Sequence, residues 1–139
     1  MDPRCTDACR EIFLHCDYRI ADLSVSIAVL CPDQVVRGRC LVTLREHVTE
    51  LFHLTPAMRT AFLEDVSRVA EALFRTLAPV KINYALLGNA VPHMHWHIIP
   101  RFREDGVYPR PIWAVDRPRV HLAAAERDQL IVAIRSDLR

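Results

Sequence analysis

The sequence predicts an α+β fold, in which an antiparallel sheet of about five strands has one long helix packed across it and a second helix at the C-terminus. Short alternating segments rich in β-branched residues occur before residue 46 and again between residues 81 and 100. An amphipathic pattern of helical period lies between them. With 139 residues, of which 51% are hydrophobic, the chain can build one sizeable core, so we expect residues 1–139 to form a single domain.

The N-terminal half is expected to supply three strands. Residues 18–23 and 26–31 alternate in polarity around a turn near Ser24, and residues 39–45 form the next such segment, with Gly38 as its turn residue. Strands this close in sequence pair as an antiparallel meander. Residues 5–16, which precede them, are expected to form a short helix or an irregular lead-in.

The long helix is predicted between Thr55 and Pro79. Thr55 suits the N-cap and Pro56 the first helical position, and Pro79 ends the pattern. Apolar side chains recur at spacings of three and four residues: Met58, Phe62, Val66, Val69, Leu73 and Leu77. One face of this helix should therefore pack across the sheet.

The remaining elements follow the helix. Residues 81–87 are expected to form a fourth strand and residues 93–99 a fifth. Residues 108–113 are interrupted by prolines and should form an ordered arm rather than a strand. Apolar residues at a spacing of four predict a helix over residues 124–138.

Three of the seven histidines fall within five positions, at His93, His95 and His97. In an extended strand successive side chains point to opposite faces, so these three share one face while the apolar residues between them face the core. The row is therefore the candidate functional site.

Two kinds of chemistry use such a row. A metal ion could be chelated by one His-x-His pair, but the Cα atoms of His93 and His97 would stand about 13 Å apart in a straight strand, too far for a single zinc. Nucleophilic catalysis on an extended anion uses all three, with a central imidazole attacking and the flanking ones contacting the anion. The third interpretation is three histidines with ordinary packing roles.

Composition excludes several function classes. The formal net charge is +1, so no broad basic surface for nucleic acid is expected. The three glycines are too dispersed for a GxGxxG or P-loop phosphate site. The N-terminus lacks an apolar signal region and no run approaches the roughly 18 apolar residues of a membrane helix, so we expect a cytoplasmic protein without a membrane partner. Five dispersed cysteines fit reduced thiols.

The segment His93-Met94-His95-Trp96-His97-Ile98-Ile99 resembles the His-φ-His-φ-His-φ-φ signature of the histidine triad (HIT) family, where φ is apolar. The likeness extends through Gly88-Asn89-Ala90-Val91-Pro92 and Pro100-Arg101, and more loosely over residues 12–113. It is closest to small bacterial proteins of the diadenosine polyphosphate hydrolase type. The resemblance implies a HIT-like fold, a homodimer and a nucleotide as the small-molecule substrate.

The resemblance also implies roles for individual residues. His95 would attack the α-phosphorus of a dinucleoside polyphosphate, which gives a covalent nucleotidyl-histidine that water then cleaves. His97 would bind a phosphate oxygen, and His93 would orient its neighbours and help to protonate the leaving group. Asn83 and Asn89 match positions that bind the α-phosphate. A nucleoside phosphoramidate hydrolase and a nucleotide-binding module with little turnover are the alternatives.

The expected reaction requires no metal or other cofactor. Some HIT proteins carry a structural zinc, and the matching positions here are Cys5, Cys9, His47 and His93. The two cysteines are separated by three residues where the family usually has two, so the zinc site is not favoured. The resemblance further implies that an acceptor near Cys31, or Asp33 in its place, holds the ribose, and that Trp113 can reach a partner subunit's site.

Overall fold

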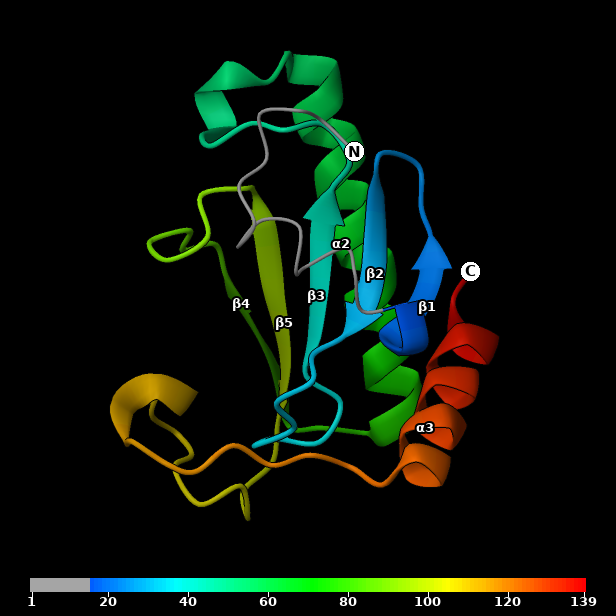
Figure 1. Cartoon of the computed structure of the whole chain (residues 1–139), viewed down its shortest axis with the longest axis vertical. Coiled ribbons are helices and arrows are strands. Elements are labelled where there is room, and N and C mark those ends of the chain that lie inside the picture. Colours follow the sequence, from blue (N-terminus) through cyan, green and yellow to red (C-terminus); the bar gives the residue numbers. More distant parts are fainter. Residues whose placement is uncertain (1–15) are drawn as a thin grey trace.

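The sheet is antiparallel throughout and has the strand order β1-β2-β3-β5-β4 in this computed structural model, which describes residues 16–139 (Figure 1). Its strands are β1 (Arg19–Asp22), β2 (Ser26–Leu30), β3 (Cys40–Leu44), β4 (Lys81–Ala85) and β5 (His95–Arg101). The five-strand prediction and the β1-β2-β3 meander are thus confirmed. The lead-in predicted before residue 16 lies outside the described residues, and a short 3-10 helix, η1 (Cys16–Tyr18), precedes β1.

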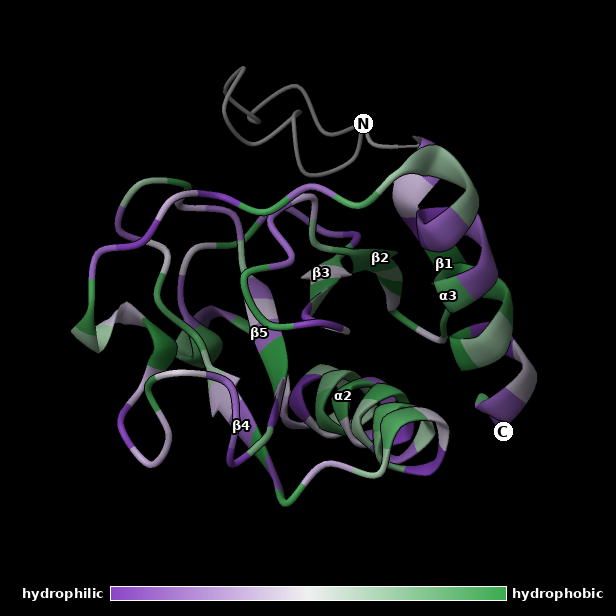
Figure 2. Ribbon diagram, turned by 90° about the horizontal axis from the view of Figure 1, so that it is seen from below, coloured by the Kyte–Doolittle hydropathy of each residue, from purple (hydrophilic) through white to green (hydrophobic). Residues whose placement is uncertain are grey.

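The helix α2 (Pro56–Leu77) begins where the sequence predicts, because the hydroxyl oxygen of Thr55 accepts a hydrogen bond from the Met58 amide and Pro56 needs no partner for its nitrogen. It ends at Ala78, whose φ of 48° is left-handed. Its apolar face packs against β2, β3 and β5. The core therefore lies between α2 and one face of the sheet, and Figure 2 shows α2 on that side.

A buried carboxylate ties α2 to the first hairpin. Asp65 is 1% exposed and accepts hydrogen bonds from the backbone amides of Ser24 and Val25 and from the Ser26 hydroxyl. A carboxylate that accepts several N–H and O–H groups is stabilised although it is buried. Asp65 therefore fixes the β1–β2 turn against the helix.

The C-terminal helix α3 (Ala124–Asp137) packs against β1 and α2 with its buried residues Leu130, Ile131 and Ile134 (Figure 1). Between β5 and α3 the chain forms the predicted arm, which contains no strand but has a 3-10 helix, η3 (Ile112–Ala114). Within residues 16–139, none of the helices combines the length and the apolar character that a membrane span requires.

The register of β3 against β5 decides which residues face the surface opposite α2. Thr43 lies opposite His95 and Leu41 opposite His97, whereas Val42 lies opposite Trp96 on the core side. Paired residues of an antiparallel sheet point to the same face. The histidine row therefore shares its face with alternate residues of β3.

Candidate active site

The histidine row is placed by β5 and by the segment just before it. The strand begins at His95 rather than at His93, because the two backbone groups of Met94 bond to different segments. The Met94 carbonyl accepts from the amide of Leu44, the last residue of β3, whereas the Met94 amide donates to the carbonyl of Val48, beyond the end of β3. The rings of His95 and His97 lie 5.1 Å apart, whereas His93 is fully buried behind them. The alternation predicted from the sequence therefore holds at the two strand positions.

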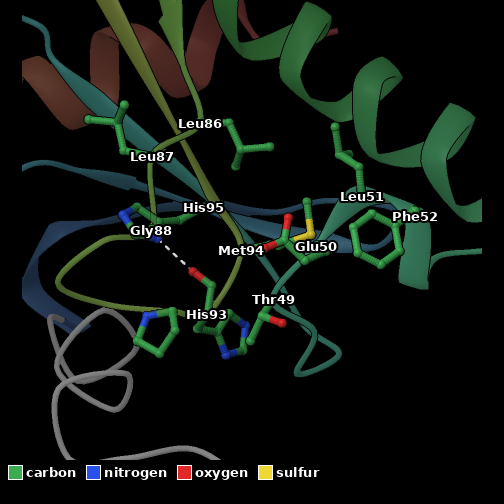
Figure 3. A pocket seen from close by; sticks show the side chains of 11 residues that line it. Thr49, Glu50, Leu51, Phe52, Leu86, Leu87, Gly88, His93, Met94 and His95 are labelled. Atoms are coloured by element: carbon green, nitrogen blue, oxygen red, sulfur yellow. Dashed lines mark hydrogen bonds between the residues drawn. The ribbon is translucent and has the colours of Figure 1, made fainter.

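His95 is held in one tautomer. Its Nδ1 lies 2.7 Å from the carbonyl oxygen of His93, the contact drawn in Figure 3. A carbonyl can only accept a hydrogen bond, so Nδ1 carries the proton and Nε2 keeps its lone pair. The residue is only 7% exposed, which limits competing contacts with water. His95 is thus prepared as a nucleophile or a base through Nε2.

Both ring nitrogens of His93 have partners that fix the orientation of its side chain. Its Nε2 lies 2.6 Å from the Leu44 carbonyl oxygen, and its Nδ1 lies 3.0 Å from Nδ1 of His47. The His93 and His47 rings meet edge to face. Nε2 of His93 therefore donates to β3, and the main-chain carbonyl of the same residue holds His95.

His97 is surrounded by groups that disfavour its cation. Its Nδ1 lies 3.3 Å from the Arg39 guanidinium, and its ring meets that of Trp113 at 5.3 Å. Burial, with the Arg39 charge and then His95 as smaller causes, lowers the pKa of His97 to about 3. His97 is therefore a neutral imidazole at physiological pH.

Arg39 is a site residue that the sequence interpretation missed. It precedes β3 by one residue, and alternation from Leu41 places it on the histidine face. Its guanidinium lies 5.5 Å from the Trp113 ring and 3.4 Å from the Asp33 carboxylate. Alternation along β3 could have indicated that Arg39 faces the same side as the histidines. That inference needs the register of β3 against β5, which the sequence does not give.

The two predicted asparagines lie in different surroundings. Asn83 pairs with Ile99, so Ala85 rather than Asn83 lies opposite His97, and its carboxamide oxygen accepts a 2.8 Å bond from Arg101. Asn89 is exposed in the loop before β5, next to Gly88, whose φ is 79°. This loop and the segment around Thr49–Phe52 border a cavity of about 380 Å³ that His93 and His95 also line (Figure 3).

The two residues predicted near the ribose differ in their surroundings, since Cys31 is buried among apolar side chains and Asp33 binds backbone amides. Cys31 is buried in a small apolar cluster with Val29 and Leu41, and burial raises the pKa of its thiol. Asp33 accepts hydrogen bonds from the amides of Val35 and Val120. Asp33 thus already organises its own loop, as the short carboxylate side chain of an aspartate commonly does in a turn.

The expected zinc ligands are only partly within the described residues. His47 and His93 are brought together, whereas Cys5 and Cys9 lie in the part of the chain that the structure does not describe. Among residues 16–139, no group of three or more His, Cys, Asp or Glu side chains is arranged to hold a metal ion. Trp113, for which the resemblance implies that it can reach a partner subunit's site, contacts His97 of its own chain.

Comparison with known proteins gives a consistent result. The HIT domain family matches residues 19–104. "Protein hit" of Bacillus subtilis is 29% identical over 86 residues, which cover 58% of this chain and 59% of that protein. The histidine triad protein blr8122 of Bradyrhizobium japonicum is 31% identical, with a TM-score of 0.80 over 87% of this chain and 90% of its own. A histidine triad protein from Sinorhizobium meliloti is 26% identical, with a TM-score of 0.78 over 86% and 88%.

Proposed function

Because the chain belongs to the HIT domain family, whose members are in general nucleotide-binding hydrolases or transferases, we propose that it cleaves dinucleoside polyphosphates at the α-phosphate through a covalent nucleotidyl-His95. The observation that carries the proposal is the bond between Nδ1 of His95 and the His93 carbonyl, which leaves the Nε2 lone pair available. Neutral imidazole is nucleophilic at that nitrogen without the help of a further base.

The reaction balances in two steps. In the first, Nε2 of His95 forms a bond to the α-phosphorus, and the bond to the leaving-group oxygen breaks with its electron pair. His93 is proposed to orient His95 and to help protonate that leaving group. In the second step, the oxygen of water bonds to phosphorus and the phosphorus–nitrogen bond breaks with its electron pair returning to Nε2 of His95. The proton that the water loses replaces the one given to the leaving group, and a nucleoside monophosphate is released.

The remaining proposed contacts stabilise the phosphate. His97 donates to a non-bridging oxygen from its neutral ring, and Asn89 contributes a donor from the loop at Gly88. Asn83 stays a proposed ligand through its amide nitrogen, with its oxygen occupied by Arg101. No metal or cofactor is proposed for the steps, because imidazole and amide donors supply the required hydrogen bonds.

Two alternatives differ in product and turnover. A phosphoramidate hydrolase would use the same nucleophile but release an amine, since HIT-type chemistry at the α-phosphorus does not itself define the leaving group. A nucleotide-binding module would bind a nucleoside phosphate and consume none. Identification of products separates the hydrolases, and binding without consumption identifies the module.

We also propose a homodimer that forms through β4. This strand is at the edge of the sheet, where its outer backbone groups have no neighbouring strand among residues 16–139. Tyr84 is 49% exposed on it, and Val80 beside it is exposed too. A second copy that pairs along this edge would satisfy the backbone and cover the apolar side chains.

Intact-mass spectrometry after brief exposure to a panel of adenylated compounds tests the reaction. We expect the native chain to gain one nucleotidyl group, and His95→Ala to gain none, because Nε2 of His95 is the proposed nucleophile. His121→Ala is the matched control, since it changes an exposed histidine far along the chain and should leave the adduct unchanged. An adduct that persists in His95→Ala would rule the proposed nucleophile out.

A further inference from the structure

We propose that Arg39 is a positioning residue that fixes the proton of His97 on Nε2, so that His97 presents an N–H donor rather than a lone pair to a phosphate oxygen. The phosphate in this statement rests on the proposed function. The position of the proton is a property of the free chain and can be measured without substrate.

The donor chemistry of arginine assigns the proton. Nη2 of Arg39 lies 3.3 Å from Nδ1 of His97. A guanidinium has only donors and stays protonated at any pH at which proteins are studied, so it cannot accept a hydrogen bond from imidazole. Nδ1 of His97 must therefore be the acceptor, and the single proton of the neutral ring lies on Nε2.

His95 provides the opposite case on the same strand. Its Nδ1 faces the His93 carbonyl, a group that can only accept, so its proton lies on Nδ1. Two identical side chains two residues apart are thus held in opposite tautomers by one obligate acceptor and one obligate donor. One ring offers a lone pair at Nε2 and the other offers a proton there, as attack on a phosphate requires of a nucleophile and its neighbouring donor.

The guanidinium of Arg39 is held in place from several sides. Asp33 lies 3.4 Å from Nη1, and the ring of Trp113 lies 5.5 Å from the guanidinium carbon. Trp113 also contacts the His97 ring, so the same side chain supports donor and acceptor. Arg39 is 7% exposed, which restricts the number of orientations that its planar fork can adopt.

A purely structural ion pair does not account for this placement. The contact with Asp33 is a single long one, and the buried Nε of Arg39 has no hydrogen-bond partner among residues 16–139. Burial of a charge with incomplete pairing is unfavourable, so the position is costly for stability. The contact with a triad histidine gives this buried charge a role in the site.

The groups around His97 leave no competing source for the proton position. The groups that face its ring are Arg39 from the start of β3, His95 from β5 and Trp113 from η3, and Ala85 lies opposite it on β4. Neither Trp113 nor Ala85 presents a side-chain acceptor to Nδ1, and His95 meets the His97 ring edge to face rather than through a hydrogen bond. Arg39 is therefore the only polar partner described for that nitrogen.

Nitrogen-15 spectra of the imidazole rings in the free, full-length chain test the proposal directly. We expect His97 to show an unprotonated Nδ1 and a protonated Nε2, and His95 the reverse. Assignment comes from the loss of one ring's signals in His95→Gln and in His97→Gln. A native chain in which His97 is protonated on Nδ1 overturns the proposal, whether or not the chain hydrolyses any nucleotide.

Variants at Arg39 then connect the proton to function. Arg39→Met removes the donor, so the His97 signals should move toward a mixture of both tautomers, and kcat should fall by about tenfold, less than the 10²–10³ for complete loss of an oxyanion donor. Arg39→Lys keeps an obligate donor and should restore most of the native spectrum and rate. Arg37→Met is the matched control, because Arg37 is exposed on the same turn and pairs with Glu126.

The outcomes separate the two proposals. If Arg39→Met keeps the native His97 spectrum while it remains folded, Arg39 does not set the tautomer. If the native chain shows the expected tautomers but neither binds AMP nor consumes any adenylated compound, the proposed function fails and the role of Arg39 in fixing the proton stands. Perturbation of the His97 Nε2–H signal by AMP in the native chain, reduced in Arg39→Met, supports both.

Discussion

His97 makes the stability of this protein depend on pH at the scale of a single residue. Burial, helped by the nearby Arg39 charge, lowers its pKa to about 3, whereas in the unfolded chain it titrates near its ordinary value of about 6.5. Between these values the unfolded chain binds the proton and the folded chain does not. Acidification therefore favours unfolding in this window, and stability is regained as the pH rises above about 6.5.

We predict that the free energy of unfolding in urea falls between pH 7 and pH 5, and that His97→Asn reduces this fall because position 97 then no longer titrates. The measurement is a set of urea titrations at several pH values for both chains, with His121→Asn as the control for loss of an exposed histidine. An identical pH dependence in His97→Asn and the native chain would contradict a depressed His97 pKa.

The sequence indicated the histidine face but not the state of each ring. Alternation along residues 93–99 identifies which side chains share a side, because it depends only on strand geometry. The tautomers depend on which groups meet each nitrogen, and those come from Arg39 and from the His93 main chain. Arg39 is more than 50 positions away in the sequence, and no local pattern connects it with His97.

At the scale of elements, the turn after β5 is organised by one buried carboxylate. Asp105 accepts from the Arg101 guanidinium and from the amides of Phe102, Val107 and Tyr108. Burial opposes the charge of Asp105, but the bond from Arg101 and the three amides outweigh it and hold the pKa of this carboxyl well below its usual range. The turn therefore depends on an ionised Asp105.

Asp105→Ala should destabilise the protein by about 3–5 kcal/mol, because it leaves the Arg101 charge buried and unpaired. Arg101 and Asp105 side chains are 1% and 3% exposed. Thermal or urea unfolding measures the loss, and Asp128→Ala, which removes a carboxylate paired on the surface, is the control with a change of less than about 1 kcal/mol. Equal effects of the two substitutions would show that burial of the pair is unimportant.

Gly38 is the residue that lets the chain enter β3 with Arg39 in place. Its φ is 91°, and an added Cβ would collide with the Leu77 side chain. We predict that Gly38→Ala lowers stability by about 1–3 kcal/mol through strain and overpacking. Gly88→Ala is the matched control, because the φ of Gly88 is also positive but the atom nearest to an added Cβ would be 3.6 Å away. In urea unfolding, Gly88→Ala should therefore lower the free energy of unfolding less than Gly38→Ala does.

The elements themselves were largely predictable. Thr55 and Pro56 mark the start of α2, and the α3 prediction over residues 124–138 differs from Ala124–Asp137 by one residue. The prediction that β5 begins at residue 93 was wrong. The Met94 amide bonds to the Val48 carbonyl, and no periodic pattern in the sequence indicates that contact. Local signals thus defined the elements, whereas contacts between distant segments decided their ends.

On the scale of the whole molecule, the α-helices α2 and α3 lie on one side of the sheet, and the histidine face carries only the short 3-10 helix η3 among residues 16–139. The spacing of apolar residues predicted which side of the sheet the helices cover. Apolar residues recur every two positions along the strands and every three to four along the helix, so each element has one apolar side. These spacings could not predict a second copy, because an exposed residue on an edge strand looks the same in sequence whether or not another chain covers it.

The proposed dimer predicts that Tyr84→Asp shifts the protein toward monomer, because the substitution introduces a charge on the β4 edge. Sedimentation velocity at several concentrations measures the shift. Val132→Asp is the control, since Val132 is 56% exposed on α3 at the opposite side of the sheet. A native chain that sediments as a monomer at all concentrations would exclude the dimer.

The edge strand β4 carries Lys81, the only lysine in the sequence. All the other side chains with a permanent positive charge are arginines. The amine of Lys81 is therefore the one side-chain group that an amine-directed dye or cross-linker modifies, and it lies on the strand edge where a second copy would pair. Fluorescence transfer between two labelled copies would thus report their association, with no engineered cysteine and no change to the sequence.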